Sequence, residues 1–95
     1  MSEKFSTLYR KIGFFETLDI LSSLQNCEAK QIEFFKHLKE RGSYLNSFFR
    51  IKRDLLRLKL IAYKLDSVND LVIHLTEKGR KLTDKITEIE QLIGN

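Results

Sequence analysis

The sequence has no proline, four glycines and a single cysteine, Cys27, among its 95 residues. With no Pro- or Gly-rich linker and no internal repeat, the chain is expected to form one domain over residues 1–95. A single cysteine excludes an internal disulfide, which favours a reducing, cytoplasmic compartment. No apolar run approaches the length of a membrane span, and residues 1–11 lack the apolar core of a signal peptide. We therefore expect no membrane partner.

Motifs for catalysis and metal binding are also missing. His37 and His74 lie in different expected elements, and no histidine lies near Cys27 in the sequence. No stretch resembles a glycine loop that binds phosphate, a paired-carboxylate site or a nucleophile triad. The sequence thus predicts no enzyme activity, no metal site and no cofactor.

The sequence does contain a strongly basic amphipathic segment at residues 43–60, with Ser43 as a plausible helix cap. Read as a helix, it places four polar residues within about 60° of one another: Asn46, Arg50, Arg53 and Arg57. The opposite stripe consists of Phe48, Ile51, Leu55 and Leu58, widened by Leu45, Phe49 and Leu56. Residues 41–64 hold seven bases and one acid, whereas the rest of the chain has ten bases and twelve acids. Such focused positive charge is typical of a helix that binds a polyanion.

The remaining chain predicts further helices and one hairpin. Apolar spacing predicts a helical extension within residues 1–13 and helices over residues 14–25 and 28–41, with Asn26 and Cys27 in the intervening turn. Residues 61–65 and 71–75 alternate like strands around a turn cluster, so a hairpin is expected over about 61–75. Thr76 is expected to cap a last helix over residues 76–95. The fold class is therefore mainly α with a small β-hairpin.

Two stretches carry a resemblance to a known family. The stretch DLLRLKLIAYKL resembles the exit of the third helix in winged helix-turn-helix proteins, usually L-x-x-x-G-L-I, although Lys59 replaces the Gly. The stretch HLTEKGRKL is similar to the second wing strand and the L-T-E-K-G start of the last helix. Over residues 14–93 the chain resembles small PadR- and MarR-like DNA-binding proteins of archaeal chromosomes, plasmids and viruses. Its five-residue wing loop contains no glycine, unlike the family pattern.

The resemblance implies a recognition helix over about residues 43–59 in the major groove and a wing over about 61–75. The residues expected to bind DNA are Ser43, Tyr44, Asn46, Ser47, Arg50, Arg53, Arg57 and Lys64. Of these, Asn46, Arg50 and Arg53 are expected to reach base edges, and the others to hold phosphates. Asp54 is expected to pair with Arg50, four residues earlier.

The terminal helices carry apolar seams that suggest a homodimer. The residues expected at its interface are Phe5, Leu8, Ile12, Ile86, Ile89 and Ile93. The expected function is sequence-specific binding of double-stranded DNA as a homodimeric transcriptional regulator with winged helix-turn-helix architecture, located in the cytoplasm on nucleoid or plasmid. The alternative is an architectural or plasmid-partition protein that spreads along DNA and has a further protein partner. A third possibility is an interaction module whose basic helix binds an acidic protein.

Overall fold

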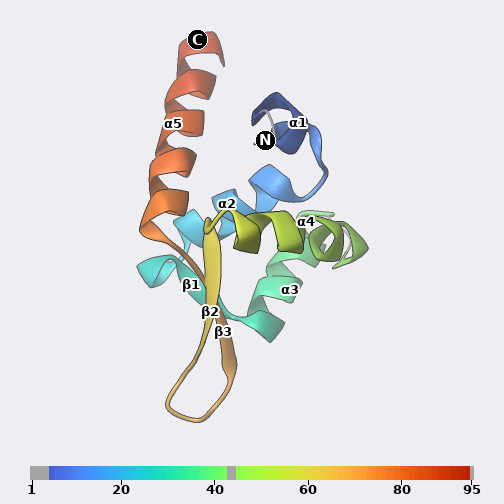
Figure 1. The fold of residues 1–95 in the computed structure, drawn as a ribbon, viewed down its shortest axis with the longest axis vertical. Helices are drawn as coiled ribbons and strands as arrows, with labels where there is room; N and C mark the ends of the chain where they lie inside the picture. The colour runs from blue at the N-terminus through green and yellow to red at the C-terminus, as the bar shows by residue number, and fades with distance from the viewer. Residues whose placement is uncertain (1–4, 43–44, 95) are drawn as a thin grey trace.

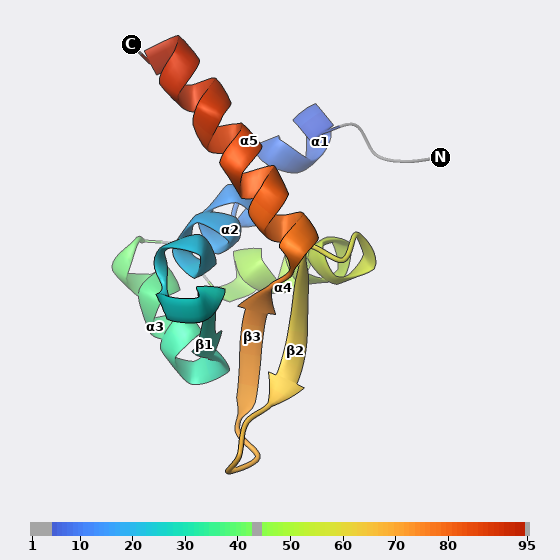
Figure 2. The same cartoon turned by 90° about the vertical axis from the view of Figure 1, so that its left-hand side faces the viewer.

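The computed structural model describes residues 5–42 and 45–94, which are mainly helical and include a small three-stranded antiparallel sheet (Figure 1). The elements in chain order are α1 (Phe5–Arg10), α2 (Phe14–Ser23), the 3-10 turn η1 (Gln25–Cys27), β1 (Glu28–Lys30), α3 (Gln31–Glu40), α4 (Leu45–Arg57), β2 (Ile61–Leu65), β3 (Leu71–Leu75) and α5 (Glu77–Gly94). The hairpin and α5 extend in opposite directions from the packed helices (Figures 1 and 2). None of the helices in the described residues has the length and apolar character that a membrane crossing requires.

The hairpin forms as predicted, but the sheet has an additional strand. We expected a helix over residues 28–41, whereas its first three residues are extended and pair with β3, so that Ala29 lies opposite Ile73. Asn26 and Cys27 both have positive φ angles, 59° and 54°, and this turn brings β1 alongside β3. The free edge of β3 provides hydrogen-bonding partners for this backbone, and α3 therefore begins only at Gln31.

The core lies where α2, α3 and α4 meet the sheet. Each of these helices contributes one fully buried phenylalanine, namely Phe14, Phe34 and Phe48. The rings of Phe34 and Phe48 pack edge to face, with 5.1 Å between their centroids, a geometry that aromatic pairs favour. Ile51 and Leu55 are also buried, so the central stripe that the sequence predicts for α4 is confirmed. One face of α4 is thereby fixed inward, and the other faces solvent.

α4 ends at Arg57, slightly earlier than the expected residue 59, and a tight turn follows it. The N–H of Lys59 donates to the carbonyl oxygen of Leu56 at 3.0 Å, and the N–H of Leu60 donates to that of Leu55 at 2.9 Å. This pair of bonds is a Schellman motif, which requires a left-handed residue after the helix. Lys59 adopts that conformation, with φ at 61°, although a residue that has a Cβ is unfavourable there.

A set of hydrogen bonds joins the end of α4 to the start of α5. The N–H of Thr76 donates to the carbonyl oxygen of Leu60 at 3.0 Å, and its Oγ1 donates to that of Lys59 at 2.5 Å. Thr76 Oγ1 also accepts the N–H of Gly79 at 3.0 Å, which confirms the predicted cap of the last helix. The two helices are therefore connected at one joint as well as through the hairpin.

Two of the residues expected at the dimer interface, Leu8 and Ile86, are buried within their own chain. Leu8, at 6% exposure, and Ile86, at 3%, are buried in the core of their own chain because α1 and α5 both lie against α2. They cannot form an exposed interface, and that part of the prediction is wrong. Tyr9 Oη donates to Glu90 Oε2 at 2.9 Å and so links α1 to α5. The large apolar side chains that do remain exposed on these helices are Phe5, Tyr9, Ile89, Leu92 and Ile93, and Ile12 is exposed in the turn after α1.

Candidate nucleic-acid interface

The solvent-facing side of α4 is the strongest candidate site. At about 100° per residue, its exposed side chains cover an arc of about 120°. Around that arc they follow in the order Leu56, Phe49, Arg53, Asn46, Arg57 and Arg50. The prediction that the four polar residues share one exposed face is therefore confirmed. Arg53 and Asn46 lie at its centre, between an apolar edge (Phe49 and Leu56) and a basic edge (Arg50 and Arg57).

The polar groups at the centre of this face are available for a ligand. Among the described residues, the side chains of Asn46, Arg50 and Arg53 form no hydrogen bond or ion pair. Guanidinium and carboxamide groups recognise purine edges through paired hydrogen bonds, which unpaired side chains can form without first breaking internal ones. Ser43 and Tyr44, also expected to bind DNA, lie outside the described residues.

The basic edge is held by an ion-pair network centred on Asp54. Its carboxylate accepts hydrogen bonds from Lys11 Nζ at 2.8 Å and from Arg57 at 3.1 Å. The lysine first, and then the arginine, lowers the pKa of Asp54 below its ordinary value of 3.8. The expected pair with Arg50 is absent, and that prediction is wrong: Asp54 is only 17% exposed and lies toward the turn after α1, where Lys11 reaches it.

Lys11 is the basic residue at this site that the sequence did not indicate. It lies 43 positions before Asp54, so no local spacing could place it beside α4. A shallow groove connects it to the exposed face, and this groove is lined by Lys11, Ile12, Ser47, Arg50 and Ile51. Ser47, which we expected to contact phosphate, is half-buried in this groove next to Arg50.

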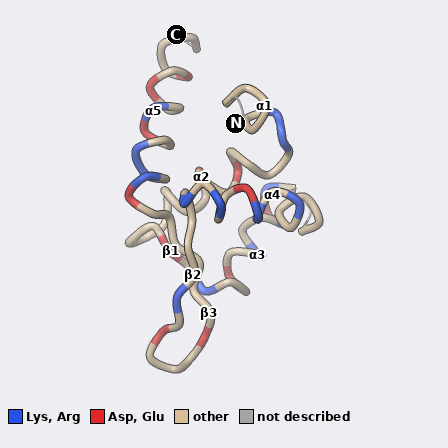
Figure 3. Tube along the Cα trace, in the orientation of Figure 1, with Lys and Arg blue, Asp and Glu red and all other residues tan. Residues whose placement is uncertain are grey.

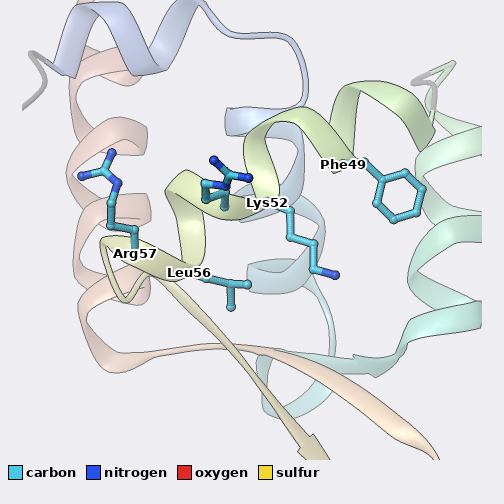
Figure 4. Close-up of a pocket in the computed structure, with 5 residues that line it drawn as sticks. Phe49, Lys52, Leu56 and Arg57 are labelled. Carbon is cyan, nitrogen blue, oxygen red and sulfur yellow. The ribbon is translucent and has the colours of Figure 1, made fainter.

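The apolar edge departs from the sequence prediction. Phe49 and Leu56 were expected to extend the buried stripe, yet Phe49 is 50% exposed and Leu56 is 36% exposed. The ring of Phe49 packs against the rim of the core, with its centroid 5.8 Å from those of both Phe35 and Phe48. The edge opens into a groove of about 590 Å³ that Phe49, Lys52, Arg53, Leu56 and Arg57 line (Figure 4). This groove combines an apolar surface with three cations.

Lys52 forms the side of this groove nearest the hairpin. Its Nζ lies 5.0 Å from the ring centroid of Tyr63 and 6.0 Å from that of Phe49, so the ammonium interacts with both aromatic faces. In Figure 4, Lys52 and Leu56 point toward β2. Burial raises the pKa of the Tyr63 phenol to about 12, so that ring stays neutral beside the lysine at physiological pH.

The hairpin loop is acidic rather than basic. Residues 66–70 contain two aspartates and no Lys or Arg (Figure 3). Asp66 Oδ1 accepts the N–H groups of Asp70 and Val68, and these bonds lower the pKa of Asp66. Lys30 pairs with Asp70 at 3.0 Å, and Lys64 pairs with Glu28 at 2.7 Å. Lys64, which we expected to hold phosphate, is therefore already neutralised by an internal partner.

The described residues contain no group of three or more His, Cys, Asp or Glu side chains placed to hold a metal ion. The site thus consists of the exposed face of α4 with Lys11 beside it. No protein-family model, curated protein or solved structure matches this chain, so the site is interpreted from its own geometry.

Proposed function

We propose that the chain is a winged helix-turn-helix protein that binds double-stranded DNA as a homodimeric transcriptional regulator. The order of elements supports this fold, because α2, α3 and α4 are followed by a hairpin and then by α5. β1 pairs with β3 and so makes the hairpin part of a three-stranded sheet. In this assignment α4 is the recognition helix, and β2 and β3 form the wing.

The observation that carries the proposal is the unpaired polar centre on the exposed face of α4. The helix has 13 residues and is therefore about 20 Å long, which suits insertion into a major groove about 12 Å wide. Arg53 matches the O6 and N7 acceptors of guanine, and Asn46 matches the N7 and N6 groups of adenine. We assign these two residues, with Arg50, to base contacts.

Arg57 and Lys11 are better suited to phosphates. Both pair with the one carboxylate of Asp54 at the basic edge, so these three groups keep a net positive charge, unlike the one-to-one pair of Lys64 with Glu28. Contacts to phosphate position a protein on the duplex without reading its sequence. The acidic loop of the wing does not suit phosphates, so the wing contributes little to affinity in this proposal.

The homodimer is proposed to form through the exposed apolar side chains of the terminal helices. After Ile86 no residue of α5 is buried within the chain, although Ile89, Leu92 and Ile93 continue its apolar pattern. A second copy would cover these side chains across a two-fold axis. That arrangement would give two recognition helices for two half-sites.

A spreading, architectural or plasmid-partition protein is the second candidate. The tip of the wing exposes Leu65, Val68 and Leu71 at the end of the molecule opposite to the free end of α5 (Figure 2). A second apolar surface of this kind would allow neighbouring dimers to contact one another along DNA. The length of the protected DNA separates the two candidates, because only a spreading protein extends its footprint as concentration rises.

The test uses a duplex selected from a random pool and a scrambled duplex, each titrated at several salt concentrations. Arg53→Ala is expected to cost roughly 1–3 kcal/mol on the selected duplex only, whereas Arg57→Ala weakens binding to both duplexes alike. Lys81→Ala on α5 removes the same charge away from α4 and is expected to change neither affinity appreciably. If the logarithm of the affinity of the unmodified chain does not change with the logarithm of the salt concentration, DNA binding is excluded as its role.

A further inference from the structure

The apolar edge of α4 has no role in hydrogen bonding or in phosphate contact. Phe49 and Leu56 are seven residues apart, so their side chains lie on one side of the helix about 10 Å from each other. They adjoin Arg53 at the centre of the exposed face, and the groove that they line is open to solvent. A ligand as broad as a DNA duplex that binds the centre of this face would therefore also cover the apolar edge.

The chemistry of the groove restricts its occupant. Its three polar lining residues, Lys52, Arg53 and Arg57, are all cations, and no acid lines it. An occupant with negative charge and a small apolar projection fits this combination. The edge of B-DNA exposed in the major groove offers one apolar group, the C5-methyl of thymine. The surface also continues into the unpaired Asn46, which favours DNA over an acidic protein.

We propose that Phe49 and Leu56 contact thymine methyl groups in the major groove, so that the target carries A·T pairs beside the position read by Arg53. This inference rests on the proposed DNA binding and adds the class of sequence that α4 prefers. The 10 Å between the two side chains corresponds to about three base-pair steps of 3.4 Å. The two contacts would therefore fall on separate thymines flanking the central arginine.

The test removes single methyl groups from DNA and leaves the protein unchanged. A duplex selected from a random pool is resynthesised with deoxyuridine in place of thymidine, at one position at a time. For the unmodified chain, we expect affinity to fall about fourfold at the positions that meet the apolar edge. Leu56→Ala and Phe49→Ala should each bind the thymidine and deoxyuridine duplexes equally well at one of those positions.

Two further variants separate methyl recognition from other effects. Arg53→Ala should weaken binding to both duplexes while keeping the ratio between them, and Ile32→Ala, an exposed apolar residue on α3, should alter neither. Phe49 also packs on Phe35 and Phe48, so thermal melts must accompany its variant, and Leu56→Ala provides an independent measurement.

The outcomes are distinct. If no deoxyuridine substitution changes the affinity of the unmodified chain, or if both variants keep the full thymidine preference, the inference is overturned although DNA binding stands. If no duplex is bound in a salt-dependent way, the proposed function itself fails.

Discussion

Gly79 occupies a position in α5 that only glycine can fill. A Cβ atom there would lie 2.2 Å from the carbonyl oxygen of Leu60 and 2.7 Å from Cδ1 of Leu75. The glycine of the L-T-E-K-G stretch is thus explained by close packing of α5 on the end of α4. We expect Gly79→Ala to lower the free energy of unfolding by roughly 2–3 kcal/mol in urea titrations, because neither backbone can move aside easily. Gly94→Ala, with open space around its Cβ position, should stay within about 0.5 kcal/mol of the unmodified chain.

Lys59 shows the opposite case, a side chain where glycine would be favoured. Its φ of 61° places a Cβ in the left-handed region, which is unfavourable for lysine. We expect Lys59→Gly to raise the free energy of unfolding by about 1 kcal/mol, measured by urea unfolding. Lys59→Ala keeps the Cβ and should give no such gain. A lower stability for the glycine variant would contradict the assignment of the Schellman motif.

At the scale of the element, the ion pairs of Asp54 limit the charge that α4 presents. Asp54→Asn removes the acid nearest the proposed phosphate contacts and releases Lys11 and Arg57 from it. We expect affinity for any duplex to rise about fivefold, corresponding to ~1 kcal/mol, and the salt dependence to become steeper. Asp84→Asn on α5 removes an equal charge from an exposed position and should have little effect. Unchanged affinity in Asp54→Asn would show that the network lies away from the DNA.

The carboxylates of Asp54 and Asp66 make the stability of the fold depend on pH. The pKa values of Asp54 and Asp66 are lowered in the folded chain, so their stabilising contribution is complete above the ordinary value of 3.8. That contribution is lost as the pH falls through the lowered values, where protonation disrupts the ion pairs and the loop bonds. Unfolding measured from pH 6 to pH 2 should show this loss, and Asp54→Asn should show a smaller one.

The spacing of apolar residues predicted most of the helices, and strand-like alternation around a turn cluster predicted the hairpin, because burial of one face of an element sets the spacing of its apolar residues. β1 escaped prediction because three residues have no period, and their partner strand lies more than 40 residues later. The polar centre of the candidate site could also be predicted, because helical spacing places its residues on one face of α4. Phe49 and Leu56 were wrongly predicted to be buried. A helical-wheel reading assigns every apolar residue to the buried face, whereas α3 and the sheet cover only part of α4. The Lys11–Asp54 pair depends on tertiary contact alone.

At the scale of the whole molecule, substitutions at the apolar end of α5 test whether the chain forms the proposed homodimer. Ile89→Asp together with Ile93→Asp should give a folded monomer by light scattering, with weaker DNA binding, because charge cannot be buried in an apolar interface. Ile86→Asp should instead unfold the chain, since Ile86 lies in its own core. If light scattering shows that the unmodified chain is monomeric at micromolar concentration, the dimer is ruled out.

The joint between α4 and α5 has a consequence for the arrangement of binding sites. Because the backbone carbonyl oxygens of Leu60 and Lys59 accept hydrogen bonds from Thr76, the proposed recognition helix α4 is expected to move together with α5, the helix proposed to pair two chains. A dimer built on α5 would therefore hold its two proposed recognition helices at one fixed separation. Half-sites about one helical turn apart lie on the same side of the duplex. Inserting about five base pairs between them would rotate one half-site to the far side, and such an operator would retain only the affinity of a single half-site.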